Sequence, residues 1–191
     1  TEFSIKDGML NPKKVVHKAI ASGMKALAIT DATAMFGDVI FYKAASAAGI
    51  KPILGADCSI TNHYNRDDYL RLLFLARNHQ GYLTLCDLLS RAWLTNQYKD
   101  RGEVDLDWIT PEMADGLIVL SGFNTGAIGK AILNGSSSAA EQEARRLSQK
   151  FPHFFTELQR VGRPNDEMLV AESVKLAKKL GLRSEEHTSE L

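Results

Sequence analysis

Short apolar runs alternate along the chain with longer segments in which apolar residues recur every three or four positions. The short runs have the length of strands, and the longer segments have the periodicity of helices that bury one face. Gly23 and Gly49 close two of these helices, and a short apolar run follows each glycine, as in α/β folds. The predicted strands cover residues 26–30, 53–60, 70–76, 116–122 and 154–159, and the predicted helices cover residues 11–23, 37–48, 79–94, 138–150 and 165–179, with a further short helix that ends at 134–135.

This order of elements predicts a mostly parallel sheet. Strands that alternate with helices of about ten residues or more form βαβ units. Five such units in sequence favour a barrel-like (β/α) arrangement, with an open doubly wound sheet as the alternative. Residues 95–110 are charged and are expected to form a loop-like insertion. The chain contains no G-x-G-x-x-G motif, Walker A loop or G-x-S-x-G elbow, so no motif supports a nucleotide-binding or hydrolase fold.

Two of the predicted strands lead into an aspartate, Asp31 in the first and Asp57 in the second. The carboxyl ends of parallel strands are where α/β folds place metal ligands and catalytic groups. Two such carboxylates suggest a site that is assembled from several strand ends. Each aspartate alone is equally typical of a helix N-cap or a turn, and that alternative stays open.

The amino-acid composition argues against several classes of function. The chain of 191 residues has 23 basic and 23 acidic side chains, so its net charge predicts no general attraction to nucleic acid or to an anionic membrane. No apolar run has the length of a membrane span, no signal peptide opens the chain, and we expect no membrane partner. Cys58 and Cys86 form no recognisable metal or disulfide pattern. Free thiols in a reducing compartment, and hence a cytoplasmic location, are expected.

Both ends of the chain look artificial. The sequence starts at Thr1 without a methionine, and after Gly181 a polar, unpatterned nonapeptide stands where an apolar strand is expected. Residues 183–191 resemble the translation of a sequencing-library adapter, so we expect a domain over residues 1–182 and a non-native tail over 183–191. The tail is predicted to be disordered or unpacked.

Several short motifs follow one another in an order that resembles a known family. They are EFSIKDG (2–8), AITD (28–31), GIKPILGAD (49–57), LARN (75–78), LSRA (89–92), GLIVLSG (116–122) and ELQR (157–160). Together they resemble the N-terminal PHP (polymerase and histidinol phosphatase) domain of bacterial DNA polymerase III alpha subunits, of the proteobacterial type. The resemblance implies a distorted (β/α)7 barrel, here truncated at both ends, with its first and last strands missing.

The resemblance also implies a metal site that this chain has partly lost. Active members hold up to three divalent metals, usually zinc, with His, Asp and Glu at the strand ends. Three positions match that pattern, namely Asp7, Asp31 and Asp57. Three others depart from it, because Ala32, Arg71 and Val161 stand where histidines are expected. A guanidinium cannot bind a metal. We therefore expect a degenerate cavity without cofactor, in which Arg71 compensates the charge of Asp31 or Asp57.

The function implied for the whole protein is DNA-directed DNA synthesis in chromosome replication, with Mg²⁺ in a polymerase domain that is absent here. This fragment is expected not to be catalytic. Its implied role is to brace the polymerase and to dock the proofreading exonuclease subunit beside other polymerase III holoenzyme subunits, with primed DNA bound through the missing domains. The alternative is a stand-alone PHP metallophosphoesterase of the histidinol phosphatase kind.

Overall fold

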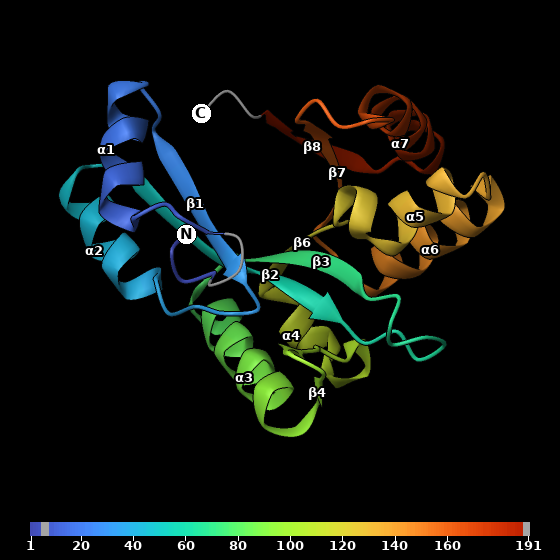
Figure 1. Ribbon diagram of the computed structural model, residues 1–191, viewed down its shortest axis with the longest axis horizontal. Coiled ribbons are helices and arrows are strands. Elements are labelled where there is room, and N and C mark those ends of the chain that lie inside the picture. Colours follow the sequence, from blue (N-terminus) through green and yellow to red (C-terminus); the bar gives the residue numbers. More distant parts are fainter. Residues whose placement is uncertain (5–7, 189–191) are drawn as a thin grey trace.

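The computed structural model describes residues 1–4 and 8–188, and only the backbone of residues 186–188. One curled sheet runs through the molecule, with helices on its outer side (Figure 1). The strands of this sheet are β1 (Ala26–Ala32), β2 (Lys51–Ile60), β3 (Leu70–Ala76), β6 (Leu117–Leu120), β7 (Phe154–Arg160) and β8 (Arg183–Thr188). The helices are α1 (Pro12–Ala21), α2 (Asp38–Ala47), α3 (His79–Thr95), α4 (Pro111–Asp115), α5 (Ala127–Leu133), α6 (Ser137–Lys150) and α7 (Asp166–Leu180), with 3₁₀ turns η1 (Leu106–Trp108) and η2 (Phe123–Thr125).

Local sequence signals account for the ends of these helices. Asn11 caps α1 by accepting a hydrogen bond from the amide of Lys13 at 3.1 Å, and Pro12 occupies the first turn, where its missing N–H costs nothing. Asn78 caps α3 in the same way, from the amide of Gly81 at 2.8 Å. Gly81 must be a glycine, because a Cβ there would lie 1.8 Å from the carbonyl oxygen of Gly116. The predicted elements between residues 11 and 180 are confirmed, with boundaries that shift by a few residues.

The strand order β1-β2-β3-β6-β7-β8 contains three parallel and two antiparallel pairs. β3 is the exception to the predicted parallel arrangement, since it runs antiparallel to both neighbours. The reason lies in the connection before it: residues 61–69 form no helix, and a parallel return needs a crossover of about a dozen residues or more. The curled six-stranded sheet is a half-barrel, which confirms the barrel-like prediction.

The predicted insertion at residues 95–110 is held in place by a buried charge cluster. It contains a short hairpin of β4 (Gln97–Tyr98) and β5 (Arg101–Gly102), followed by η1. Glu103 is fully buried and accepts hydrogen bonds from Arg66 and Arg101, each at 2.9 Å. Because Arg66 belongs to the β2–β3 connection, Glu103 ties two surface segments together.

Apolar side chains form one large core and two smaller ones. The large core lies between the outer face of the sheet and the helices α3 to α6, around Phe74, Leu88 and Phe151. A second core lies under α1 and α2, and a third packs α7 onto β7. The second core consists of Val16, Ala19, Ile29, Phe41, Ala45 and Ile50. No helix in the described part of the chain is long and apolar enough to cross a membrane.

Of the two predicted states of the tail, disordered or unpacked, the first is wrong for residues 183–188. Their backbone forms β8, which pairs in parallel with β7 from Arg183 opposite Phe155 to Thr188 opposite Arg160. Backbone hydrogen bonding depends little on sequence, and an open edge strand such as β7 accepts any extended segment that follows α7. Residues 189–191 lie outside the described residues. The non-native origin of the tail stays a prediction.

Candidate functional site

The two strand aspartates point to opposite faces of the sheet. Ala32 of β1 pairs directly with Asp57 of β2, and side chains alternate along a strand, so Asp31 lies on the other face from Asp57. Asp31 is fully buried on the side of α1 and α2, where the hydroxyls of Thr1 and Ser4 each donate to its carboxylate at 2.7 Å. The amino group of Thr1 donates to Asp31 as well. The structure thus does not bring Asp31 and Asp57 together, and Asp7 lies outside the described residues.

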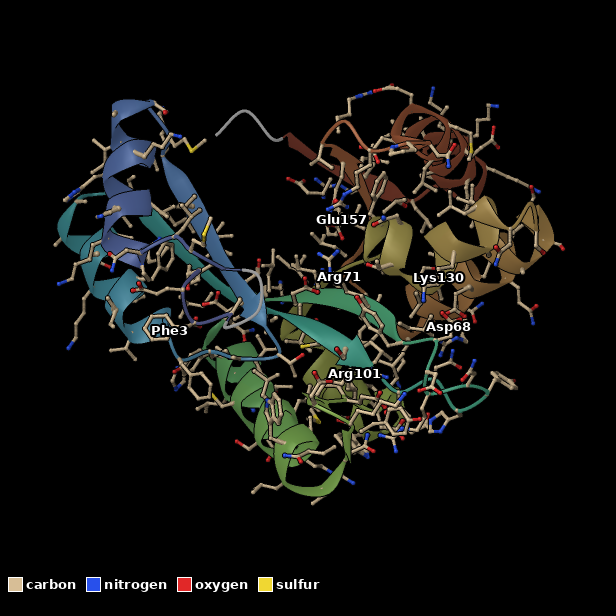
Figure 2. The ribbon with its side chains drawn as sticks, in the orientation of Figure 1. Phe3, Asp68, Arg71, Arg101, Lys130 and Glu157 are labelled. Atoms are coloured by element: carbon tan, nitrogen blue, oxygen red, sulfur yellow. The ribbon has the colours of Figure 1, made fainter. Side chains whose placement is uncertain are left out.

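On the inner face of the sheet, Arg71 lies between two carboxylates. Its Nε donates to Oδ1 of Asp57, and its Nη2 lies 3.8 Å from Oε1 of Glu157 (Figure 2). Its Nη1 reaches the hydroxyl of Thr125 at 3.4 Å. Asp57, Arg71 and Glu157 come from β2, β3 and β7, so this cluster spans the half-barrel. The charge compensation expected of Arg71 is thus found at Asp57 and not at Asp31.

Burial and charge act in opposite directions in this cluster. Burial raises the pKa of Asp57, and the positive charge and hydrogen bond of Arg71 offset only part of that effect. Burial also acts to lower the pKa of Arg71, but the charges of Asp57 and Glu157 outweigh it, so the pKa of Arg71 is raised. Arg71 therefore stays charged. Its positive charge lowers the free-energy cost of burying the carboxylates of Asp57 and Glu157 in a low-dielectric region.

Glu157 is the site residue that the sequence analysis overlooked. It is 1% exposed and accepts hydrogen bonds from the amide of Gly122 at 3.0 Å and from the side chain of Gln159 at 2.6 Å. Gly122 has a φ of +78°, and a Cβ there would lie 2.2 Å from the carbonyl oxygen of Arg71, so only glycine permits this approach. The sequence signal that was overlooked is the position of Glu157 inside a predicted, largely apolar strand.

The positions that depart from the family pattern hold side chains without ligand atoms. Ala32 is exposed on β1, and its amide donates to the hydroxyl of Ser4 at 2.9 Å. Val161 follows β7 and is 38% exposed, and its amide donates to Asp166 at 3.1 Å. Together with Arg71, these residues leave Asp57 and Glu157 as the two carboxylates of the inner cluster in the part of the chain that the structure describes.

A second buried acid lies close to Asp31. Asp38 begins α2, is 1% exposed, and neither of its carboxylate oxygens has a hydrogen-bond partner among the described residues. Burial raises its pKa from 3.8 to about 7, and the negative charge of Asp31 adds to the rise. The sequence analysis treated this position as a helix start, and nothing in the local pattern marks it as buried.

A separate group of side chains at the surface could hold a metal ion. His63, Asp105 and Asp107 present ligand atoms that all lie within 4.8 Å of one another. Nε2 of His63 lies 3.3 Å from Oδ2 of Asp105, while Oδ1 of Asp105 accepts the amide of Asp107 at 3.0 Å as the cap of η1. The sequence gives no local sign of this group, because His63 is about forty residues away from the two aspartates.

Comparison with protein families and curated proteins gives one consistent result. A family model for the PHP domain matches residues 1–161. The DNA polymerase III alpha subunit of Neisseria meningitidis is 44% identical over 188 residues, which is 95% of this chain and 16% of the relative. The same subunit of Escherichia coli K12 is 39% identical over 183 residues, again 95% of this chain and 16% of the relative. The chain thus spans about a sixth of the length of these relatives.

Solved structures with a similar fold are more distant in sequence. An amidohydrolase from Chromobacterium violaceum superposes with a TM-score of 0.63 at 14% identity, over 98% of this chain and 86% of that protein. A protein assigned as a metal-dependent phosphoesterase from Bifidobacterium adolescentis superposes with a TM-score of 0.62 at 10% identity, over 94% of this chain and 82% of that protein. At these identities the likeness concerns the fold alone.

Proposed function

Because this chain belongs to the PHP domain family, we propose that it is the N-terminal region of a DNA polymerase III alpha subunit, in which it is a non-catalytic scaffold. The whole protein is then a DNA-directed DNA polymerase, with Mg²⁺ bound in a domain outside this chain. The observation that carries the scaffold proposal is the position of Arg71 between Asp57 and Glu157.

The inner cluster does not fit the metal centre of active family members. A metal centre needs several lone pairs that converge on one point, whereas a guanidinium offers five N–H donors and no acceptor. Arg71 also supplies the positive charge that Asp57 and Glu157 require. We therefore derive no hydrolytic step through a metal at this cluster.

The proposed role of the scaffold is to dock the proofreading exonuclease subunit, beside other subunits of the polymerase III holoenzyme. A domain whose inner cluster is occupied by an arginine in place of a metal is suited to binding through its surface. Primed DNA is assigned to domains outside this chain, in keeping with the balanced overall charge. A polymerase subunit of this kind works in the cytoplasm.

The metal proposal is tested by elemental analysis of the purified full-length protein after equilibration with zinc or manganese. We expect less than one ion per chain at the inner cluster, and no hydrolysis of p-nitrophenyl phosphate. Two or three ions per chain that are lost in Asp57→Asn would overturn the proposal. Ions lost in His63→Ala instead would assign the metal to the surface group of His63, Asp105 and Asp107.

The docking proposal is tested by size-exclusion chromatography of the full-length alpha subunit mixed with the exonuclease subunit. Co-elution that is lost when residues 1–182 are deleted, while polymerase activity on primed DNA is kept, supports it. Co-elution that survives the deletion refutes it. The retained polymerase activity serves as the control for a general loss of folding.

The second candidate function is a stand-alone PHP metallophosphoesterase. The observation in its favour is the convergence of His63, Asp105 and Asp107 within 4.8 Å. It predicts an uninterrupted gene much shorter than those of the polymerase relatives and a zinc-dependent phosphatase activity. A reading frame that continues into a polymerase domain would exclude it.

A further inference from the structure

Asp38 is a buried carboxylate that lines a hollow between two helices. The hollow has a volume of about 460 Å³ and lies between α2 and α3, and Pro52 and Leu54 of β2 and Ala76 of β3 also line it. Asp38 is 1% exposed, and neither of its carboxylate oxygens has a hydrogen-bond partner among the described residues. Burying a carboxylate without a partner costs free energy, so an unpaired acid of this kind needs an explanation. Its position on a hollow of ligand size makes it a candidate ligand contact.

Aromatic side chains of both helices face this hollow. Tyr42 belongs to α2 and is 52% exposed, and Tyr82 belongs to α3. The ring of His79 stacks on that of Tyr82, with the ring centroids 6.4 Å apart and an angle of 20° between the ring planes. The pKa of Tyr82 is raised, first by Cys86 and by burial and then by the negative charge of Asp38, so Tyr82 lies near that carboxylate. Aromatic rings beside a polar anchor suit a flat, aromatic ligand.

The exposed groups that line the hollow favour an anion. Lys43 is exposed and follows Asp38 by five residues on α2, which places it about 7.5 Å farther along the helix axis. Asn78 and His79, at the start of α3, line the same hollow. The first N–H groups of a helix and the positive end of its dipole favour phosphate. The hollow therefore combines a buried acceptor of N–H groups with an exposed place for negative charge.

We propose that this hollow binds a guanine nucleotide. The base pairs with Asp38 between the rings of Tyr42 and Tyr82, and the phosphates lie at Lys43 and at the start of α3. Guanine presents two adjacent donors on its Watson–Crick edge, N1–H and the N2 amine, and an ionised carboxylate accepts both. The other common nucleobases place an acceptor beside their donor on that edge, and an ionised carboxylate has no N–H or O–H to offer it.

This nucleotide site is separate from the inner cluster and from the motifs of common nucleotide-binding folds. Leu54 and Asp57 are three residues apart on β2, so their side chains lie on opposite faces of the sheet. The hollow thus lies on the other face from Asp57 and Arg71. The chain contains no glycine-rich phosphate loop, and in the proposed site the start of α3 and Lys43 take the place of one. The inference does not depend on the proposed function.

The test is titration calorimetry of the full-length protein with guanosine 5′-diphosphate and with adenosine 5′-diphosphate at pH 8. Burial and the charge of Asp31 raise the pKa of Asp38 to about 7, so its carboxylate is ionised at this pH. EDTA removes divalent metal ions, on which nucleotide binding in a polymerase domain depends. We expect the guanosine compound to bind about tenfold or more tighter than the adenosine compound, because only guanine forms the paired contact with Asp38.

The variant Asp38→Asn separates recognition of the base from a general effect on folding. Its amide offers a donor and an acceptor, so affinity for guanosine diphosphate should fall about tenfold or more. Xanthosine diphosphate, which carries a carbonyl oxygen in place of the N2 amine, should bind this variant more tightly than it binds the wild type. Such a gain cannot come from a folding defect.

Two further variants complete the design. Lys43→Ala should weaken the binding of guanosine diphosphate and leave that of guanosine, which has no phosphate, unchanged. Asp87→Asn, on the exposed side of α3, is the matched control for Asp38→Asn and should bind both nucleotides like the wild type.

Three results would overturn the proposal. The first is no binding of guanosine diphosphate to the wild type at a ligand concentration of about 1 mM. The second is equal affinity for the guanosine and adenosine compounds, which would mean that no base is recognised. The third is unchanged binding of guanosine diphosphate by Asp38→Asn, which would place the nucleotide elsewhere on the protein.

Discussion

Replacing the buried acid of α2 tests how the N-terminal layer, which consists of α1 and α2 with β1 and the small core beneath them, is stabilised. In Asp38→Asn, a neutral amide of the same shape takes the place of a carboxyl group that has no hydrogen-bond partner among the described residues. The folded chain raises the pKa of Asp38 from 3.8 to about 7, so the folded state holds this proton more tightly than the unfolded state. The unfolding free energy of the wild type therefore falls as the pH rises from about 4 to about 7.

The size of the effect follows from the pKa difference. One pKa unit corresponds to about 1.4 kcal/mol, so the rise from 3.8 to about 7 corresponds to at most about 4.5 kcal/mol above pH 7. Water entry and local relaxation relieve part of this cost, and we expect Asp38→Asn to gain about 1–4 kcal/mol over the wild type at pH 8 relative to pH 4. The side chain is 1% exposed, so screening by solvent does not remove the effect.

The assay is urea unfolding of the 191-residue chain, followed by circular dichroism, at pH 4, 6 and 8. Asp87→Asn on the exposed side of α3 is the matched control and should show the same difference from the wild type at all three pH values. A difference between Asp38→Asn and the wild type that does not change from pH 4 to pH 8 would refute the reasoning, because it would mean that Asp38 is solvated or paired.

Three further substitutions test the other buried charges by the same urea unfolding. Arg71→Ala leaves Asp57 and Glu157 facing each other without a cation and should cost about 3 kcal/mol, whereas a cost under about 0.5 kcal/mol would mean that the cluster is open to water. Asp31→Ala removes the acceptor of two hydroxyl donors and should cost about 1–3 kcal/mol. Glu103→Gln leaves two arginines without their buried counter-ion and should cost about 2–4 kcal/mol; an unchanged midpoint would show that the insertion needs no such anchor.

The strands and helices of this fold follow from the sequence because their signals are local. Caps such as Asn11 and Asn78 and the glycine stops at 23 and 49 act within a few residues, and they set element boundaries directly. The direction of β3 does not follow from such signals. It depends on the length of the connection before it and on which neighbours it meets across the sheet.

The candidate site was predictable in part. The sequence predicts that Arg71 compensates either Asp31 or Asp57, and the structure shows that the partner is Asp57. The separation of Asp31 from Asp57 follows from a register of one residue, which no local pattern specifies. Glu157 joins the cluster only through the folded sheet, since it is far along the chain from Arg71.

The tail shows a different limit. Polar composition correctly indicates that residues 183–185 are exposed, and it wrongly predicts that residues 183–188 form no strand. β8 pairs with β7 through backbone groups that every residue carries. Amino-acid composition therefore predicts whether a segment is buried better than it predicts whether the segment pairs with an open edge strand.

The small core under α1 and α2 has a consequence for the dynamics of the chain. Its six residues are separate from the large core, so the N-terminal layer can open as a cooperative unit at a lower free-energy cost than global unfolding. Amide protons of α1 and α2 should then exchange with solvent faster than those of α3 and β3. A partner bound to the outer side of α1 and α2 would slow that exchange by mass action, including at amides that it never touches. Hydrogen exchange would thus detect such binding as slower amide exchange throughout the N-terminal layer.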